Sequence, residues 1–193
     1  MRVIAGRFRG RKLLAPRGLK TRPTADRARQ ALFDVLGPLA EARVLDLYAG
    51  TGALGIEALS RGAAHAVFVE SDRFALACIR KNLEALQLVD SATVLPLAVE
   101  RAAAALRPLA PFDLVLCDPP WEHLDGALRT LARLLRADLE GLPTRVVIEH
   151  PSAKSLDLAL PAGLEKTDER RWGDTGATVF TAKARAKAGT WPT

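Results

Sequence analysis

The sequence contains few of the residues that build disulfide frameworks or metal sites. Its 193 residues include only two cysteines and three histidines. Cys78 and Cys117 stand alone in apolar surroundings, as expected of reduced core residues in a cytoplasmic protein. The histidines are scattered, without the spacing of a metal-ligand set. We therefore predict neither a disulfide nor a metal site.

Long hydrophobic runs are also missing. No apolar run approaches the roughly 18 residues that span a bilayer, and the basic N-terminus is not followed by the apolar stretch of a signal peptide. An apolar content of 49% with a charged content of 26% is typical of a soluble globular protein. We expect a cytoplasmic protein that has no membrane association and consists of one domain with a small appendage.

Positive charge is concentrated at the N-terminus. The whole chain carries a net charge of +6, but residues 1–29 carry +9 and the remainder −3. This asymmetry favours a polyanionic partner, because each Lys or Arg beside a phosphate releases counterions. A solvated basic tail is the alternative, although the apolar residues at 3–5 and 13–14 indicate folded structure. The candidate nucleic-acid contacts are Arg7, Arg9, Arg11, Lys12, Arg22, Arg27 and Arg29.

Strand and helix patterns alternate along most of the chain. Short strands over 2–6 and 11–15 would form a hairpin, and Thr24 is suited to cap a helix over 25–36. The alternation that follows predicts βαβ units and a doubly wound α/β fold with a parallel sheet. The predicted strands are 42–48, 66–70, 93–98, 112–117 and 145–150, and the predicted helices are 53–61, 73–87, 99–107, 123–137 and a short stretch near 152–159.

Two further strands complete the prediction at the C-terminal end. Strands over 164–171 and 177–183 flank a short loop and would add an antiparallel hairpin to a mostly parallel, seven-stranded sheet. The chain is then divided into a basic extension of hairpin and helix (1–38), a catalytic domain (39–183) and a basic tail (184–193).

A glycine-rich loop follows the strand predicted over 42–48. Gly50, Gly52 and Gly55 have the G-x-G-x-x-G spacing, which lets the backbone turn tightly beside a ligand but suits NAD equally well. Asp46, inside the strand, would repel a pyrophosphate but attract the amino group of a methionine moiety. Glu70, which ends the next strand, is placed to accept both hydroxyls of a ribose. The two acids favour S-adenosylmethionine over NAD.

A second motif, Asp118-Pro119-Pro120-Trp121, follows the apolar run 112–117. An exocyclic base amine is a poor nucleophile because its lone pair is delocalised into the ring. Two acceptors, the Asp118 carboxylate and the Pro119 carbonyl, would favour a pyramidal nitrogen and aim its lone pair at a sulfonium methyl. Consecutive prolines fix φ and lack N–H donors, and Trp121 offers a face for a flipped base. Together the two motifs predict methyl transfer to a base amine.

These residues resemble the Asn/Asp-Pro-Pro-aromatic amino-methyltransferases. The chain from Arg2 to about Thr181 is similar to one family among them, the RsmD-like 16S ribosomal RNA guanine-N2 methyltransferases. The most specific segments are 6–13, 22–29, the glycine-rich loop, 118–120 and 171–175. The N-terminal segments discriminate best, because the Asp-Pro-Pro-aromatic motif is shared with adenine methyltransferases. The resemblance implies a class I, Rossmann-like methyltransferase fold, S-adenosyl-L-methionine as cofactor, and ribosomal RNA or the small ribosomal subunit as partner, with no obligate protein partner.

The resemblance also assigns roles to single residues. The amine site would be formed by Asp118 to Trp121, and Trp121 replaces the Phe or Tyr that is common in relatives. Many relatives hold the cofactor's adenine amine with Asp or Asn at the end of the third strand, where this chain has Ala98. Adenine recognition would then rest on backbone groups or on Glu100, and the sequence leaves both open. The predicted cofactor contacts are Asp46, Tyr48, Ala49, Gly50, Thr51, Gly52, Gly55, Glu70, Ser71 and Ala98.

Three rival functions are compatible with parts of this pattern. An adenine-N6 methyltransferase acting on DNA or RNA would use the same motif, but such enzymes usually carry a sizeable target-recognition domain for which this chain has no spare residues. An NAD-dependent oxidoreductase would need a substrate domain and would place Asp46 against the pyrophosphate. A nucleic-acid-binding module with an inactive cofactor site would not need intact glycines together with Asp118.

Overall fold

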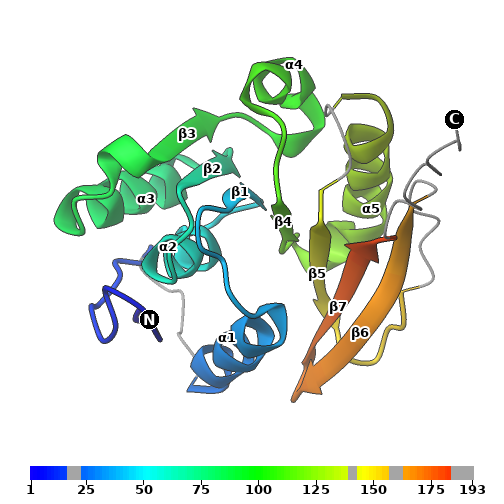
Figure 1. Cartoon of the computed structure of the whole chain (residues 1–193), viewed down its shortest axis with the longest axis horizontal. Coiled ribbons are helices and arrows are strands. Elements are labelled where there is room, and N and C mark those ends of the chain that lie inside the picture. The colour runs from blue at the N-terminus through cyan, green and yellow to red at the C-terminus, as the bar shows by residue number, and fades with distance from the viewer. Residues whose placement is uncertain (17–22, 139–142, 157–162, 184–193) are drawn as a thin grey trace, which may run out of the picture.

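A seven-stranded sheet forms the centre of the molecule. A computed structural model of the chain describes residues 1–16, 23–138, 143–156 and 163–183. The strand order is β3-β2-β1-β4-β5-β7-β6 (Figure 1). The first five strands run parallel, whereas β7 is antiparallel to both β5 and β6. The strands are β1 (Arg43–Leu47), β2 (His65–Glu70), β3 (Ala92–Pro96), β4 (Leu114–Cys117), β5 (Arg145–Pro151), β6 (Leu164–Trp172) and β7 (Thr175–Ala182).

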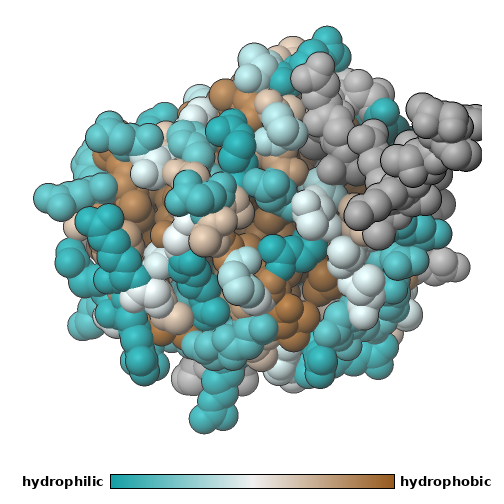
Figure 2. Space-filling model, viewed as in Figure 1, coloured by the Kyte–Doolittle hydropathy of each residue, from teal (hydrophilic) through white to brown (hydrophobic). Residues whose placement is uncertain are grey.

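Helices cover both faces of the sheet, because alternate residues of the central strands bury in opposite directions. In β1, Val44 belongs to one hydrophobic cluster and Leu45 to the other. The first cluster includes residues of α1 (Pro23–Leu36), α2 (Ala53–Ser60) and α3 (Arg73–Ala85), and the second includes residues of α4 (Ala103–Leu106) and α5 (Leu124–Arg133). Hydrophilic residues cover much of the visible surface, with apolar residues showing between them (Figure 2). The doubly wound fold with its C-terminal antiparallel hairpin is thereby confirmed.

Several element boundaries differ from the prediction. The helix predicted over 99–107 is divided into the 3-10 turn η2 (Val99–Arg101), the short helix α4 and the 3-10 turn η3 (Arg107–Leu109). Pro108 lies in the first turn of η3, where its missing N–H and its ring oppose a continuous α-helix. The predicted helix 123–137 is likewise composite, with η4 (Trp121–His123) before α5 and the π-helical η5 (Leu134–Asp138) after it.

The remaining differences lie near the two ends of the chain and after β5. Helix α1 begins at Pro23, so Thr24 falls inside its first turn instead of capping it. The N-terminal hairpin forms, but it is held by an isolated Arg2–Lys12 bridge instead of two full strands. No helix follows β5 over 152–156, and the rest of that predicted stretch, like the tail 184–193, lies outside the described residues. A short 3-10 turn, η1 (Val89–Ser91), precedes β3.

The N-terminal hairpin and α1 pack onto the same core as the sheet. Val3 and Leu13 of the hairpin, and Leu32 and Phe33 of α1, belong to the hydrophobic cluster that contains residues of α2 and α3. In Figure 1 the hairpin lies beside α2. The extension therefore shares its core with the α/β part, and the boundaries of the three-part division stay a prediction. Across the described residues, no helix has the length and apolar character needed to cross a membrane.

Candidate cofactor and substrate site

Two adjoining cavities open at the carboxyl ends of β1, β2 and β4, where ligands of open α/β sheets bind. Tyr48, Gly50, Glu70 and Asp118 line both cavities. The first cavity, of about 440 Å³, also has Met1, Ala28, Arg29, Asp46, Glu149 and Thr175 among its lining residues. The second cavity, of about 660 Å³, also has Ser71, Glu100, Pro119, Pro120, Trp121 and His123 among them. The predicted cofactor and amine motifs therefore meet at one place.

The glycine-rich loop turns sharply between β1 and α2. Tyr48, Gly50 and Gly52 all have positive φ angles, of 58°, 54° and 76°. Gly55 is required for a different reason, since a Cβ there would lie 2.3 Å from the Phe68 ring and 3.0 Å from the Asp46 carboxylate. Glycine at 55 thus lets the first turn of α2 pack directly on the strands, and this close approach brings Asp46 to the helix.

Asp46 is buried beneath the loop, with 1% of its surface exposed. Its Oδ2 accepts a hydrogen bond of 2.9 Å from the Gly55 N–H. Its Oδ1 is buried without a hydrogen-bond partner among the described residues. Burial raises the pKa of this carboxyl well above its usual range, and the carboxylates of Asp118 and Glu70 add to the effect. An unpaired carboxylate oxygen at a cavity is suited to accept from a cationic or N–H-bearing ligand.

Glu70 connects the loop to the start of α3. Its Oε2 accepts from the Gly50 N–H at 2.7 Å, and its Oε1 accepts from the N–H groups of Ser71 and Asp72 at 2.7 and 2.8 Å. A carboxylate oxygen can accept more than one hydrogen bond, so these contacts orient Glu70 without exhausting its capacity. Its role toward ribose hydroxyls stays a prediction.

Glu100 lies at the second cavity, opposite the end of β1. The Tyr48 hydroxyl donates to Glu100 Oε1 at 3.0 Å, and burial together with Glu100 raises the pKa of the tyrosine. Ala98 is not among the residues that line either described cavity, and its carbonyl accepts from the Arg101 N–H. The sequence left backbone groups or Glu100 open for recognition of the cofactor's adenine. The structure places Glu100 at the second cavity.

Asp118 follows β4 and borders both cavities. Its side chain opens to solvent through the cavity mouth, but protein surrounds it on the other sides, and this desolvation raises the pKa of the carboxyl to about 6. Pro119 is buried, whereas Trp121 is 42% exposed and lines the second cavity. The predicted amine motif therefore presents one carboxylate and one accessible aromatic ring beside the cofactor loop.

Sequence reasoning missed Glu149, which lines the first cavity near the end of β5. Burial raises the pKa of its carboxyl well above the usual range, Asp118 adds to this, and Arg29 opposes it. The available signal was an acidic residue directly after the apolar run 146–148 of the strand RVVIEHP. That signal did not distinguish a cavity residue from a solvent-exposed one.

The predicted RNA contacts fall into two groups. Arg7, Arg9, Arg11, Lys12 and Arg27 are exposed, and their role stays a prediction. Arg22 lies outside the described residues.

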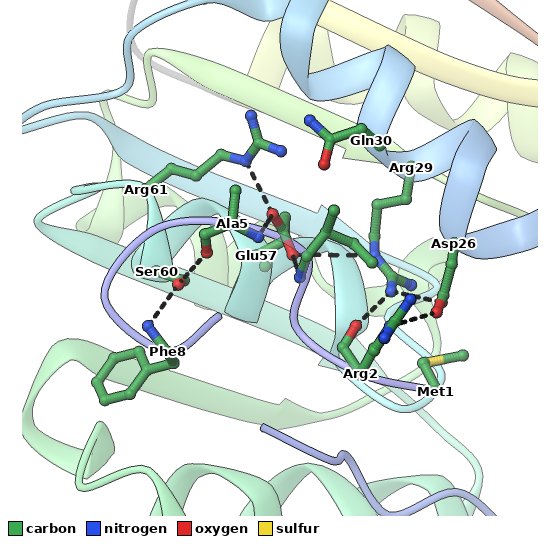
Figure 3. Close-up of polar contacts among 12 residues, drawn as sticks. Met1, Arg2, Ala5, Phe8, Asp26, Arg29, Gln30, Glu57, Ser60 and Arg61 are labelled. Atoms are coloured by element: carbon green, nitrogen blue, oxygen red, sulfur yellow. Dashed lines mark hydrogen bonds and ion pairs between the residues drawn. The ribbon is translucent and has the colours of Figure 1, made fainter. Parts of the chain in front are cut away.

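Arg29 differs from the prediction, because it is only 6% exposed. Its guanidinium donates to the Arg2 carbonyl at 2.5 Å and to Asp26 at 3.0 Å, and its Nε lies 4.0 Å from Glu57 (Figure 3). These internal partners hold the side chain at the first cavity, and its role toward RNA stays a prediction.

The strand order, the reversed β7, the glycine loop after β1 and the acid that ends β2 define a class I methyltransferase fold. Solved structures agree. An Escherichia coli methyltransferase candidate, YhhF, is 33% identical with a TM-score of 0.79, over 96% of this chain and 99% of that one. The Thermus thermophilus protein TTHA0928 is 30% identical with a TM-score of 0.74, over 93% and 98%.

The chain belongs to the family described as "Conserved hypothetical protein 95", whose model matches residues 1–181. It is 37% identical over 186 residues to Bacillus subtilis YlbH, named as a candidate rRNA methyltransferase, covering 93% of this chain and 98% of that protein. It is 40% identical over 136 residues to Escherichia coli ribosomal RNA small subunit methyltransferase D, covering 70% and 66%. The RsmD-like resemblance drawn from the motifs is confirmed.

Proposed function

We propose that this protein transfers a methyl group from S-adenosylmethionine to the exocyclic N2 amine of a guanine in small-subunit ribosomal RNA. The observation that carries the proposal is the position of Asp118, where the amine motif borders two cavities that are both lined by Glu70, the first of them also by Asp46. The names of its relatives, which include small-subunit rRNA methyltransferases, support the choice of RNA as substrate.

The cofactor fits the donors and acceptors of the site. The unpaired Oδ1 of Asp46 would accept from the amino group of the methionine moiety, and Glu70 would accept from the ribose hydroxyls. Glu100 and Ser71, in the second cavity, would lie at the adenosine end. When bound, S-adenosylmethionine supplies an activated methyl group on a positively charged sulfur.

The amine site then acts by positioning. Asp118 accepts one N–H of the target amine and the Pro119 carbonyl accepts the other, so that the nitrogen lone pair points toward the methyl carbon. The methyl group would pass from the sulfur to this nitrogen, and the positively charged amine would then release a proton to Asp118 or to water. Because the proton leaves after methyl transfer, no strong base is required, and alignment can account for most of the rate.

The test is transfer of labelled methyl groups to small ribosomal subunits from cells that lack this protein, followed by nucleoside analysis. We expect the label in N2-methylguanosine. Asp118→Ala should lower the single-turnover rate by roughly 100-fold or more, as for other single losses at preorganised sites, with little change in cofactor binding. Label in N6-methyladenosine would replace the proposal with the adenine alternative.

The cofactor assignment has its own test by titration calorimetry. The protein should bind S-adenosylmethionine and not NAD. Asp46→Asn keeps an oxygen for the Gly55 N–H but removes the charge, so cofactor affinity should fall by about tenfold or more. Asp90→Asn, an exposed change in η1, is the matched control and should leave affinity unchanged. NAD binding without a response to S-adenosylmethionine would contradict the assignment.

A further inference from the structure

Glu149 lies beside Asp118 at the carboxyl ends of two neighbouring strands. The parallel pairing of β4 with β5 aligns Cys117 with Ile148, so Asp118 and Glu149 are the next residues along each strand. Both residues line the first cavity, which Asp46 and Thr175 also line. Two carboxylates therefore face one space at the point where the target amine is proposed to bind.

The Glu149 carboxylate has no hydrogen-bond partner inside the described part of the chain. The charged groups acting on it come from three elements: Asp46 of β1 and Asp118 after β4 repel it, and Arg29 of α1 attracts it. Arg29 is already engaged by Asp26 and the Arg2 carbonyl. A half-buried carboxylate with like charges nearby is unfavourable for folding, and such groups are concentrated at sites that bind a ligand.

We propose that Glu149 is the specificity residue that distinguishes guanine from adenine by accepting the N1–H of the target base. This inference rests on the proposed function. Guanine presents N1–H and the N2 amine side by side on its Watson–Crick edge. A carboxylate accepts hydrogen bonds, so Asp118 binds the amine while Glu149, the adjacent carboxylate, binds N1–H.

The same arrangement excludes adenine. Adenine carries an amine beside N1, but its N1 bears a lone pair instead of a hydrogen. An ionised Glu149 would then face a second acceptor, and the hydrogen bond that it makes to the N1–H of guanine would be lost. Sites built to bind a particular N–H group reject analogues that lack it, because the protein group is left unpaired. Glu149 thus supplies the discrimination that Asp118, which is common to guanine and adenine methyltransferases by resemblance, does not.

The experiment compares two target bases that carry the same amine. Small subunits are reconstituted with 16S RNA that has either guanine or 2-aminopurine at the nucleotide methylated by the full-length protein. 2-Aminopurine keeps the N2 amine and has a lone pair at N1. The wild-type protein should methylate guanine about 10- to 100-fold faster than 2-aminopurine. Glu149→Gln, whose amide can donate to N1, should abolish or reverse that preference, and Glu165→Gln on β6 is the matched control that should not.

The experiment distinguishes failure of the proposed function from failure of the role of Glu149. No methylation of guanine by the wild-type protein would contradict the proposed function itself. An unchanged guanine preference in Glu149→Gln, or equal loss of activity on both bases with intact cofactor binding, would overturn the role of Glu149. If Glu149→Gln fails to fold, Glu149→Asp is measured instead, since it retracts the carboxylate by one methylene. A guanine preference as large as that of the wild type in this variant would likewise overturn the inference.

Discussion

Three carboxylates, Asp46, Asp118 and Glu149, face one cavity, and each has a raised pKa. Desolvation is the largest cause for all three, and repulsion between them adds to it for Asp46 and Glu149. Such a cluster opposes folding, so its presence is better explained by ligand binding than by stability. A positively charged sulfonium and the N–H groups of a base are the kinds of ligand that would relieve it.

The raised pKa of Asp118 predicts a pH-dependent rate. The ionised carboxylate is the stronger acceptor for the amine, and the pKa of this carboxyl is about 6. Single-turnover methylation should therefore be constant above about pH 7 and fall by about tenfold per unit well below pH 6. Asp118→Asn keeps an oxygen acceptor without a titration, so it should show a lower rate without this step. A wild-type profile that is flat from pH 5 to 8 would contradict the assignment.

The Asp118 carboxyl should affect stability in the opposite direction: ionisation raises the methylation rate but lowers the stability of the fold. The folded protein holds this proton more tightly than the unfolded chain does, so the contribution of Asp118 to stability falls as pH rises from about 4 to 6. Asp118→Asn should accordingly melt higher than the wild type near pH 7.5, with no such advantage near pH 4, and solvent screening of this exposed residue keeps the difference small. Thermal unfolding at the two pH values measures the difference.

The sequence could predict Asp46, Glu70 and Asp118 as site residues, because each lies within or directly after a strand whose carboxyl end meets the others at one edge of the sheet. It could not predict Glu149 as a member of the site, since its strand pairs with both β4 and β7 and its neighbours follow only from that pairing. The burial of Arg29 could not be predicted for a related reason. Its partners Glu57 and Asp26 come from two different helices, so its burial depends on tertiary packing.

Among the elements, the N-terminal hairpin is attached to α2 by a buried carboxylate. Glu57 is fully buried and accepts from the N–H groups of Ile4 and Ala5 at 2.7 and 3.0 Å, and from Arg61 at 2.8 Å (Figure 3). Ser60, one turn later, bonds the Ala5 carbonyl and the Phe8 N–H. The hairpin that the sequence predicted is thus fixed to α2 by side chains of that helix, which local strand propensity does not encode.

Removing the charge of Glu57 should detach this hairpin. Glu57→Gln places an amide N–H₂ against backbone N–H donors and leaves Arg61 without its buried partner, so we expect a loss of about 3 kcal/mol of unfolding free energy. Urea unfolding measures the loss, and trypsin cleavage after Arg7 and Arg9 should become faster. Glu84→Gln, exposed on α3, is the control. Unchanged cleavage would show that the hairpin has other sufficient contacts.

Gly6 gives an independent test of the same attachment. Its φ is 76°, and a Cβ at this position would lie 1.8 Å from the Ser60 carbonyl oxygen. Gly6→Ala therefore cannot be accommodated without moving the hairpin away from α2, and it should increase cleavage in the same way as Glu57→Gln. Gly10→Ala is the matched comparison, because Gly10 has a similar φ of 83° but open space around the added Cβ. If both variants behave alike, backbone strain and not contact with α2 limits the substitution.

For the whole molecule, the alternating pattern was sufficient to predict the sheet, its mainly parallel direction and its C-terminal hairpin. The pattern located helices but not their ends, as the division around Pro108 shows. The pattern also did not show that the basic hairpin packs against the rest of the fold. This packing places Met1 at the first cavity, and the same hairpin carries exposed basic residues.

The charge distribution leads to a prediction about RNA binding. Residues 1–29 carry +9 and the rest of the chain −3, so the catalytic part alone should be repelled by ribosomal RNA. Replacing Arg7, Arg9, Arg11 and Lys12, all exposed, with Ala should weaken RNA binding and reduce its salt slope by up to about 4 units. Cofactor affinity should hardly change, because none of the four lines either cavity. RNA affinity at several salt concentrations measures the slope.

Two comparisons make this result interpretable. Arg11 also donates to the Ala85 carbonyl at 3.1 Å, so thermal unfolding must show that the quadruple variant keeps its hairpin attached. Arg129 and Arg136 belong to α5 and η5, whose residues pack on the other face of the sheet, and replacing both with Ala should leave the slope nearly unchanged. Equal slopes for the wild type and the quadruple variant would mean that these side chains are merely solvated. The RNA surface would then have to be sought around the turn between β6 and β7, where Arg170 and Arg171 are exposed.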